Sequence, residues 1–149
     1  MSIEIREATI SDVELGLLDV FIEGYRFHQN ARQDIFVNIS DDKLKEELIK
    51  NFEMFKTLVI LNDKKIVGYI SYKIKEKTSK KIFIDQLVIS KEYRGQGLGK
   101  KLIDKVKKIA IEIKCDRIEL DCWSFNTNAL KMYEHIGFEQ QRIIYEMKL

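Results

Sequence analysis

Residues 82–102 read IFIDQLVISKEYRGQGLGKKL. The first part of this stretch, residues 82–89, is rich in Ile, Phe, Leu and Val, the residue types that suit a buried strand. From Leu98 to Ile113 the apolar residues recur at steps of three and four, as on one face of an amphipathic helix. The stretch therefore predicts a strand that passes through a glycine-rich turn into a helix, with the glycines at the helix N-terminus.

The glycine-rich turn has the chemistry of an anion-binding site. A helix N-terminus leaves its first backbone N–H groups without partners, and the helix dipole is positive at that end. Gly95, Gly97 and Gly99 lack a Cβ, so a phosphate can approach the backbone and φ can be positive where the turn requires it. Basic residues also outnumber acidic ones here: Lys91, Arg94, Lys100, Lys101, Lys105, Lys107 and Lys108 against Glu92 and Asp104. We therefore expect a ligand that carries phosphate groups.

The spacing of the glycines excludes two common phosphate motifs. A dinucleotide fingerprint, G-x-G-x-x-G, starting at Gly95 would need a glycine in place of Lys100. A P-loop, G-x-x-x-x-G-K-[ST], that used Lys100 would need Ser or Thr in place of Lys101 and a glycine at position 94. The pattern that remains is Arg94-x-x-Gly97-x-Gly99.

This pattern resembles the acyl-CoA-binding motif of the GNAT superfamily of N-acetyltransferases, which is Gln or Arg, x, x, Gly, x, Gly or Ala. A second segment is also similar to the family, whose members carry Asn-x-x-Ala and then Tyr-x-x-x-Gly-Phe. This chain has Asn126-Thr127-Asn128-Ala129 followed by Tyr133-Glu134-His135-Ile136-Gly137-Phe138. The two motifs occur in the family's order and at its spacing, and together they span residues 82–138, over a third of the chain.

Composition limits the class of protein. A chain of 149 residues with 45% hydrophobic content suits one domain, residues 1–149, and no linker or repeat divides it. The formal net charge of +2 argues against a nucleic-acid partner. No apolar run approaches a membrane span of about 20 residues and no signal-peptide core is present, so we expect a cytoplasmic protein without a membrane partner. Cys115 and Cys122 lack metal-ligand spacing, and we expect reduced structural thiols and no metal.

The N-terminal third predicts a strand and two helices. Ile3 to Arg6 suits an opening strand, and Ser11-x-x-Glu14 has the form of a capping box that begins a helix. Its inward residues are expected to be Val13, Leu17, Val20 and Phe21. A second helix is predicted from about Asp41, with Leu44, Leu48 and Phe52 buried.

The remaining elements complete an α/β fold with a mixed sheet. Residues 57–61 and 65–74 flank the turn Asn62-Asp63-Lys64 and predict a hairpin, residues 117–122 predict a strand, and residues 126–136 predict a helix. The order β-α-α-β-β-β-α-β-α-β matches the GNAT acyl-CoA N-acyltransferase fold, with helices on both faces of the sheet. Eleven residues follow Phe138, for which we expect one long strand or two short ones joined near Gln141-Arg142.

The resemblance implies acetyl-CoA as cofactor and a set of residues that hold it. The backbones of Leu87, Val88 and Ile89 would bind the pantetheine amides as an added strand does. Asn126 would form a hydrogen bond near the pantetheine arm, and Ala129 belongs to the same motif. The pyrophosphate would be held through the main-chain N–H groups of the loop that comprises Arg94, Gly95, Gln96, Gly97, Leu98, Gly99 and Lys100.

The resemblance also implies a general acid. Tyr133 lies seven residues after Asn126, about two turns and roughly 10 Å further along the same helix face. In the family a tyrosine here donates a proton to the leaving sulfur, and a phenol with a pKa near 10 is protonated at neutral pH. The alternative is that Tyr133 is an aromatic core residue of an amphipathic helix.

Two carboxylates are candidates for a general base that acts through water. Asp121 occupies a strand position where some GNAT enzymes have an acidic catalytic residue, and we rank it slightly ahead of Asp85, which lies in the strand before the glycine loop. A partly buried carboxylate would have a raised pKa that suits a base. Each could instead be a hydrogen-bonded carboxylate at a strand end.

The acceptor pocket is expected from the first two helices and their connection, Phe27 to Phe36. His28 could contact the substrate there, and Glu23 and Asp34 could attract a cationic amine. The predicted function is an acetyl-CoA-dependent N-acetyltransferase that acts by direct attack of a primary amine of a small molecule or peptide. The alternative is a catalytically idle CoA-binding regulatory domain, and the sequence leaves open whether the protein is a monomer or a homodimer.

Overall fold

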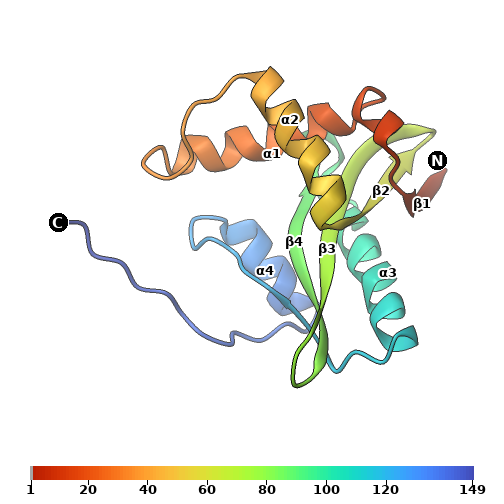
Figure 1. The fold of residues 1–149 in the computed structure, drawn as a ribbon, viewed down its shortest axis with the longest axis vertical. Helices are drawn as coiled ribbons and strands as arrows, with labels where there is room; N and C mark the ends of the chain where they lie inside the picture. Colours follow the sequence, from red (N-terminus) through yellow and green to blue (C-terminus); the bar gives the residue numbers. More distant parts are fainter. Residues whose placement is uncertain (1) are drawn as a thin grey trace.

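Five strands form one sheet in the order β1-β2-β3-β4-β5 in a computed structural model, which describes residues 2–149 (Figure 1). The strands are β1 (Ile3–Glu7), β2 (Lys56–Asn62), β3 (Lys65–Glu76), β4 (Lys80–Ile89) and β5 (Arg117–Leu120). Neighbours are antiparallel except β4 and β5, which are parallel. The predicted hairpin is confirmed, since Asn62 of β2 pairs with Lys65 of β3.

Helices cover both faces of this sheet. On one face lie α1 (Leu17–Ala31) and α2 (Asp41–Met54), and on the other lie α3 (Leu98–Glu112) and α4 (Thr127–His135); short 3-10 helices are η1 (Ile10–Val13) and η2 (Lys91–Tyr93). A hydrophobic core lies on each face of the sheet, and the side chains of β2 alternate between the two. Val59 packs with α1 and α2, whereas Ile60 packs with α3. The central strands are therefore apolar on both faces, as in a sheet that is covered on both sides.

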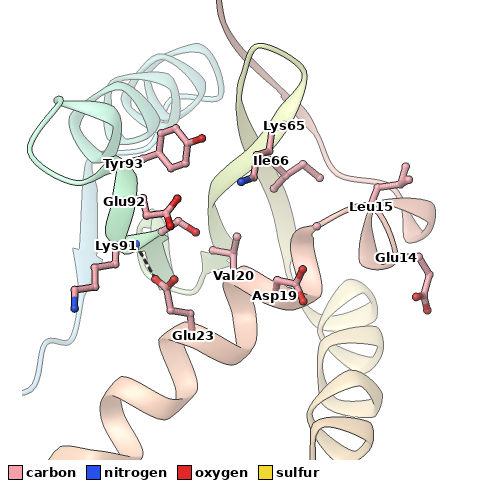
Figure 2. A pocket seen from close by; sticks show the side chains of 12 residues that line it. Glu14, Leu15, Asp19, Val20, Glu23, Lys65, Ile66, Lys91, Glu92 and Tyr93 are labelled. Atoms are coloured by element: carbon pink, nitrogen blue, oxygen red, sulfur yellow. Dashed lines mark hydrogen bonds between the residues drawn. The ribbon is translucent and has the colours of Figure 1, made fainter.

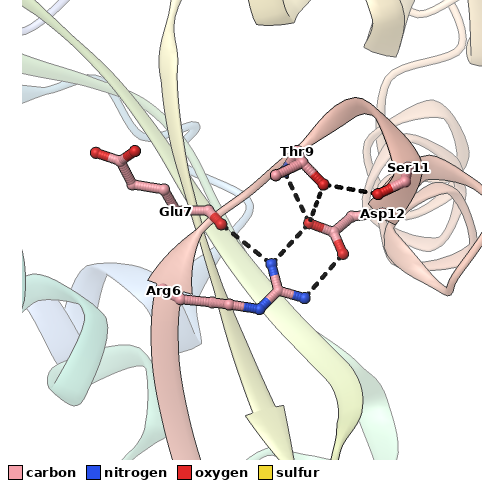
Figure 3. Close-up of polar contacts among 5 residues, drawn as sticks. All are labelled: Arg6, Glu7, Thr9, Ser11 and Asp12. Atoms are coloured by element: carbon pink, nitrogen blue, oxygen red, sulfur yellow. Dashed lines mark hydrogen bonds and ion pairs between the residues drawn. The ribbon is translucent and has the colours of Figure 1, made fainter.

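An ion pair fixes the junction between β1 and α1 (Figure 3). Asp12 is 1% exposed and accepts hydrogen bonds from Arg6 Nη1 at 2.8 Å and Arg6 Nη2 at 2.9 Å. Its Oδ2 also accepts from the backbone N–H of Thr9 at 2.8 Å. The hydrogen bonds from Arg6 lower the pKa of Asp12, so the carboxylate stays ionised at neutral pH.

The predicted helix start at Ser11 is wrong. Asp12 satisfies the N–H of Thr9, so the chain forms a 3-10 turn at Ile10–Val13 instead, and α1 begins at Leu17 after Gly16 with φ +123°. The capping-box pattern could not predict this 3-10 turn, because the residue that orients Asp12 is Arg6, which lies on β1 and not on the helix. The four residues predicted to point inward are nevertheless buried: Val13, Leu17, Val20 and Phe21.

The expected strand or strands after Phe138 do not form among the described residues. Residues 139–149 have no regular secondary structure, and in Figure 1 they run away from the sheet to the C-terminus. A strand exists only when its backbone pairs with another strand, and β5 already ends at Leu120, two residues earlier than predicted. The GNAT-like order therefore stops at α4. Within residues 2–149, no helix is both long and apolar enough to cross a membrane.

Replacing Asp12 with Ala should lower the free energy of unfolding by about 2 kcal/mol, because Arg6 and the N–H of Thr9 lose their acceptor. The cost stays below that of a fully buried pair because the Arg6 side chain is 36% exposed and can be solvated. Since its pKa is lowered in the folded protein, the contribution of Asp12 is present above the ordinary carboxyl pKa and is lost as pH falls through the lowered value.

Urea unfolding at neutral pH and at pH 3 measures this cost. The matched control is Glu46→Ala, which removes an exposed ion pair with Lys43 and should cost less than about 0.5 kcal/mol. Equal losses in the two variants at neutral pH would show that the Arg6–Asp12 pair does not stabilise the junction.

Candidate active site

The glycine loop has the backbone that an anion cradle requires. Gly95 has φ +79° and Gly97 has φ +76°, a region that residues with a side chain rarely adopt. Gly97 is also the N-cap residue of α3, so the unpaired N–H groups of the first helical turn follow it directly. A Cβ built at either glycine meets no other atom within 4 Å. The space next to the loop is therefore open to a ligand.

Gly99 serves a different purpose from the one that the motif suggests. It lies inside α3 without a positive φ, and a Cβ there would come within 3.2 Å of Met132 Sδ on α4. The absence of a side chain at Gly99 therefore lets α3 and α4 pack closely. The motif combines two loop glycines that shape the cradle with one helical glycine that sets helix packing.

Side chains near the loop leave its main chain free. Arg94 Nε donates to the carbonyl of Ile89 at 2.9 Å, and Arg94 Nη2 lies 3.5 Å from Glu23 Oε2. Glu23 also accepts from the backbone N–H of Lys91 at 2.9 Å (Figure 2). Lys100 is paired with Asp104 at 2.8 Å. Glu23 thus anchors the start of the loop, which is not the amine-attracting role suggested by the sequence.

The strands β4 and β5 separate at a defined point. Their pairing runs from Lys81–Arg117 to Ile84–Leu120 and then stops. At this point β4 contains one residue more than β3, because Tyr72 pairs with Ile84 whereas Ser71 pairs with Gln86. The extra residue, Asp85, forms a bulge, and a bulge bends the strand that contains it.

Beyond the bulge, one edge of β4 is open. Leu87, Val88 and Ile89 pair with β3 on one side, and no residue of β5 pairs with them on the other. The side chains of Leu87 and Ile89 pack against the core, so this edge offers backbone groups, of which the carbonyl of Ile89 already accepts from Arg94 Nε. The residues predicted to bind pantetheine therefore lie where an extended ligand can add to the sheet.

Tyr133 and Asn126 lie at the two ends of α4. Asn126 is the N-cap residue, and its side chain makes no capping hydrogen bond, so the amide is available to a ligand. Tyr133 packs against Phe138 with ring centroids 5.6 Å apart. Burial raises the pKa of Tyr133 above its ordinary value, and a charge on Cys122 would raise it further. The phenol is therefore protonated throughout the neutral range.

Asp85 and Asp121 flank the opening between the strands. Each is the first residue after the last β4–β5 pair, Ile84–Leu120. Both lie outside regular strand pairing, since Asp85 is the bulged residue of β4 and Asp121 follows the end of β5, and both residues are exposed. Asp85 is exposed at the surface, but partial desolvation by the surrounding chain still raises its pKa, and the charge of Lys73 acts in the opposite direction. Asp121 is exposed, and none of the hydrogen bonds or ion pairs found within residues 2–149 involves its side chain.

An aromatic cluster lies on the face of the sheet that α1 covers. The sequence predicted only its members from the connection Phe27 to Phe36. We define it as Phe27, His28, Phe36, Trp123 and Phe125, with neighbouring ring centroids 5.4 to 6.1 Å apart. The cluster joins the predicted acceptor connection to the segment between β5 and α4. Trp123 and Phe125 were not predicted from the sequence to belong to this site. Their position between the candidate base Asp121 and the cofactor-binding candidate Asn126 could have indicated it.

Charged residues border the aromatic cluster. The guanidinium of Arg32 lies 5.2 Å from the ring centroid of Trp123, a cation–π distance. Arg32 is held by Asp34 at 2.9 Å and by Glu146 at 2.8 Å. The hydrogen bond from Arg32 lowers the pKa of Asp34 to about 2. Asp34 is thus engaged with Arg32 and is not free to attract an amine, contrary to the sequence-based suggestion.

A separate hollow of about 660 Å³ lies between the N-terminal half of α1 and the end of β4 (Figure 2). Its charged lining is mixed and comprises Glu14, Asp19, Glu23, Glu92, Lys65 and Lys91. None of the candidate catalytic residues or loop glycines lines it. We therefore do not assign this hollow to the reaction.

An open strand edge next to a helix N-terminus that can bind phosphate defines a protein that binds an extended, phosphorylated cofactor. Residues 21–138 match the model of the Acetyltransferase (GNAT) family. The chain therefore belongs to this family, and it is an enzyme of the acetyl-CoA-dependent N-acetyltransferase class.

Relatives extend over most of the chain. A probable spermine N(1)-acetyltransferase from Bacillus subtilis subsp. natto is 26% identical over 145 residues, covering 93% of this chain and 89% of the relative. The thialysine N-epsilon-acetyltransferase of Mus musculus is 27% identical over 146 residues, covering 91% and 84%. In fold, the chain is similar to the tetramutant of the BH1408 protein from Bacillus halodurans, with a TM-score of 0.86 at 23% identity and coverage of 98% and 99%.

Replacing Gly97 with Glu should abolish the rise in thermal midpoint that acetyl-CoA produces, because the new side chain adds volume and negative charge where phosphate would bind. NAD should produce no shift in the wild-type protein. The control is Gly137→Glu, which adds the same charge at another positive-φ glycine with open surroundings. If Gly97→Glu and Gly137→Glu respond to acetyl-CoA equally, the cofactor phosphates bind elsewhere.

Proposed function

We propose that residues 1–149 form a single domain that transfers the acetyl group of acetyl-CoA to a primary amine of a small cationic substrate. The observation that carries the proposal is the opening between β4 and β5. We expect the cofactor on the side of α3 and α4, where Tyr133 packs, and the amine on the side of α1, which contributes Phe27 and His28 to the aromatic cluster. An amine can approach from one side a thioester held from the other.

The chain's own residues fit the cofactor. The open cradle at Gly95 and Gly97 suits the pyrophosphate, since no atom occupies the positions where a Cβ would lie. The unpaired edge of β4 suits the pantetheine amides, and the free side-chain amide of Asn126 can add a hydrogen bond. When bound, acetyl-CoA supplies an activated acetyl thioester. Holding amine and thioester together accounts for much of the expected rate, because proximity removes the entropy cost of their encounter.

Tyr133 is the proposed general acid. Its raised pKa keeps a proton on Oη, and this proton is available to a leaving thiolate. The ring is fixed by Phe138 and by the core beneath α4, so the hydroxyl has little freedom to move.

Asp85 is the proposed general base, ahead of Asp121, which reverses the order suggested by the sequence. Both flank the opening, but Asp85 lies on β4 itself, next to the edge proposed to bind the cofactor, and partial desolvation raises its pKa. A more basic carboxylate accepts a proton from an amine, directly or through water, more readily.

The acceptor is proposed to be a small aliphatic amine such as a polyamine or a lysine-like amino acid. The relatives that cover most of the chain are named for spermine and thialysine. Aromatic rings suit the methylene groups and charge of such a substrate, and the exposed Asp121 adds an acidic group near the opening.

A panel of amines tests the function. Purified protein is supplied with acetyl-CoA and with spermine, spermidine, thialysine or a peptide with a free N-terminus, and released thiol is measured. We expect kcat/KM to be highest for the polyamines or thialysine. Thiol release that no amine accelerates, together with tight CoA binding, would favour the alternative of an idle CoA-binding regulatory domain.

Tyr133→Phe should lower kcat about 10- to 1,000-fold and leave acetyl-CoA affinity almost unchanged. The ring still packs against Phe138, while the proton donor is lost. The control is Tyr145→Phe, which removes an exposed hydroxyl and should leave kcat unchanged. A wild-type kcat for Tyr133→Phe would assign the proton to another donor, whereas lost affinity alone would make Tyr133 a structural residue.

Asp85→Asn should lower kcat about 100-fold, whereas the matched variant Asp121→Asn should keep most of the wild-type kcat. Because a base works only when deprotonated, the wild-type rate should fall more steeply with decreasing pH below the raised pKa of Asp85 than the rate of Asp85→Asn does. The measurement is log kcat/KM between about pH 3.5 and 9, a range chosen to include the ordinary pKa of an aspartate carboxyl, about 3.9. The opposite ranking of the two variants would restore Asp121 as the base.

A further inference from the structure

His28 is the one member of the aromatic cluster that can accept a hydrogen bond, since phenylalanine has no polar side-chain atom and the ring N–H of Trp123 only donates. The Nδ1 atom of His28 lies 2.8 Å from the carbonyl oxygen of Gly24. A carbonyl only accepts, so Nδ1 carries the proton, and Nε2 of the neutral ring keeps a lone pair. None of the hydrogen bonds found within residues 2–149 involves Nε2. His28 therefore presents an acceptor in a fixed tautomer to a ligand that enters the cluster.

Aromatic rings surround this acceptor and give it no competing partner. The imidazole centroid lies 5.5 Å from that of Phe27, 5.4 Å from that of Phe36 and 5.6 Å from that of Phe125. These rings come from α1, from the connection that follows it and from the loop that leads into α4, which lies next to the C-terminal half of α1 in Figure 1. Ring faces attract cations, and their apolar surface suits methylene groups. The surroundings of Nε2 thus suit an ammonium group on an aliphatic chain.

The charged groups that border the cluster are already paired. Two guanidinium groups contact its rings, those of Arg32 and Arg94. Arg32 pairs with Asp34, and Arg94 lies 3.5 Å from Glu23 Oε2. Neither guanidinium is left unpaired to repel an incoming cation, and both carboxylates are engaged. Because Arg94 begins the glycine loop, its contact also shows that the cluster borders the candidate cofactor site.

We propose that His28 determines substrate specificity: its Nε2 accepts a hydrogen bond from a second, distal ammonium group of the acceptor, while the reacting amine at the other end of the chain reaches the thioester. This inference rests on the proposed function and narrows the substrate class to aliphatic diamines and polyamines. An ammonium group only donates hydrogen bonds, which matches an imidazole nitrogen that only accepts. A monoamine of the same length leaves Nε2 without this partner and is therefore used less well.

Paired substrates measure the contribution of the second ammonium group. Released thiol gives kcat/KM for linear α,ω-diamines and for the monoamines of equal chain length, at about pH 8, where an imidazole is mostly neutral. In the wild-type protein the best diamine should exceed its matched monoamine about 10- to 100-fold, as expected for a hydrogen bond to a charged group. His28→Phe keeps an aromatic ring without the acceptor and should bring this ratio close to one. The control is His135→Phe, which replaces the other, exposed histidine and should keep the wild-type ratio.

A second pair of variants separates the acceptor from the packing of the ring. In His28→Gln the side-chain carbonyl can take the place of Nε2, whereas in His28→Asn the shorter amide can take only the place of Nδ1 at the Gly24 carbonyl. The diamine preference should therefore persist in His28→Gln and be lost in His28→Asn, even if His28→Phe proves unstable.

The outcomes distinguish this inference from the proposed function. Acetylation of amines with no diamine preference in the wild type, or with the wild-type preference kept in His28→Asn, would overturn the role of His28 alone. If no amine is acetylated, the proposed function is wrong and the role of His28 falls with it.

Discussion

The parallel pairing of β4 and β5 ends after Ile84–Leu120, and the rest of the site depends on this ending. The extra residue at the Asp85 bulge bends β4 away from the course of β5. The separation exposes one edge of β4 and brings the two aspartates to the opening. If the strands stayed paired, their own hydrogen bonds would occupy the backbone groups that an extended cofactor needs.

Close packing of α1 on β4 connects the two sides of the site. A Cβ at Gly24 would lie 2.9 Å from Val88 Cγ2, so the helix can approach the strand only because it has a glycine there. The neighbouring residue, Glu23, then reaches the backbone N–H of Lys91 and holds the beginning of the glycine loop. Further along the same helix, Phe27 and His28 contribute to the aromatic cluster. A single helix thus positions both the cradle and the acceptor face.

Local patterns in the sequence predicted most helices, strands and glycine positions, because hydrophobic periodicity and positive φ are determined within a few residues. Features that depend on distant partners were missed. Asp12 is oriented by Arg6 from β1, and Trp123 contacts Phe36 across the fold; in each pair the two residues lie on different segments, so no local pattern relates them. The strand or strands expected after Phe138 were also wrong: that expectation came from the resemblance to the family, and a strand forms only where another strand lies beside it to pair with.

In the proposed mechanism, the same physical effect, desolvation, acts on Tyr133 as the acid and on Asp85 as the base. Removing a group from water disfavours its charged form, which raises the pKa of a phenol and of a carboxyl alike. For Tyr133 the shift keeps the hydroxyl protonated at neutral pH, although it also lowers the driving force for donating that proton to a thiolate. For Asp85 the shift makes the ionised carboxylate a better proton acceptor, while the charge of Lys73 limits the increase in pKa. The opening between the strands therefore needs no unusual side chain to provide both an acid and a base.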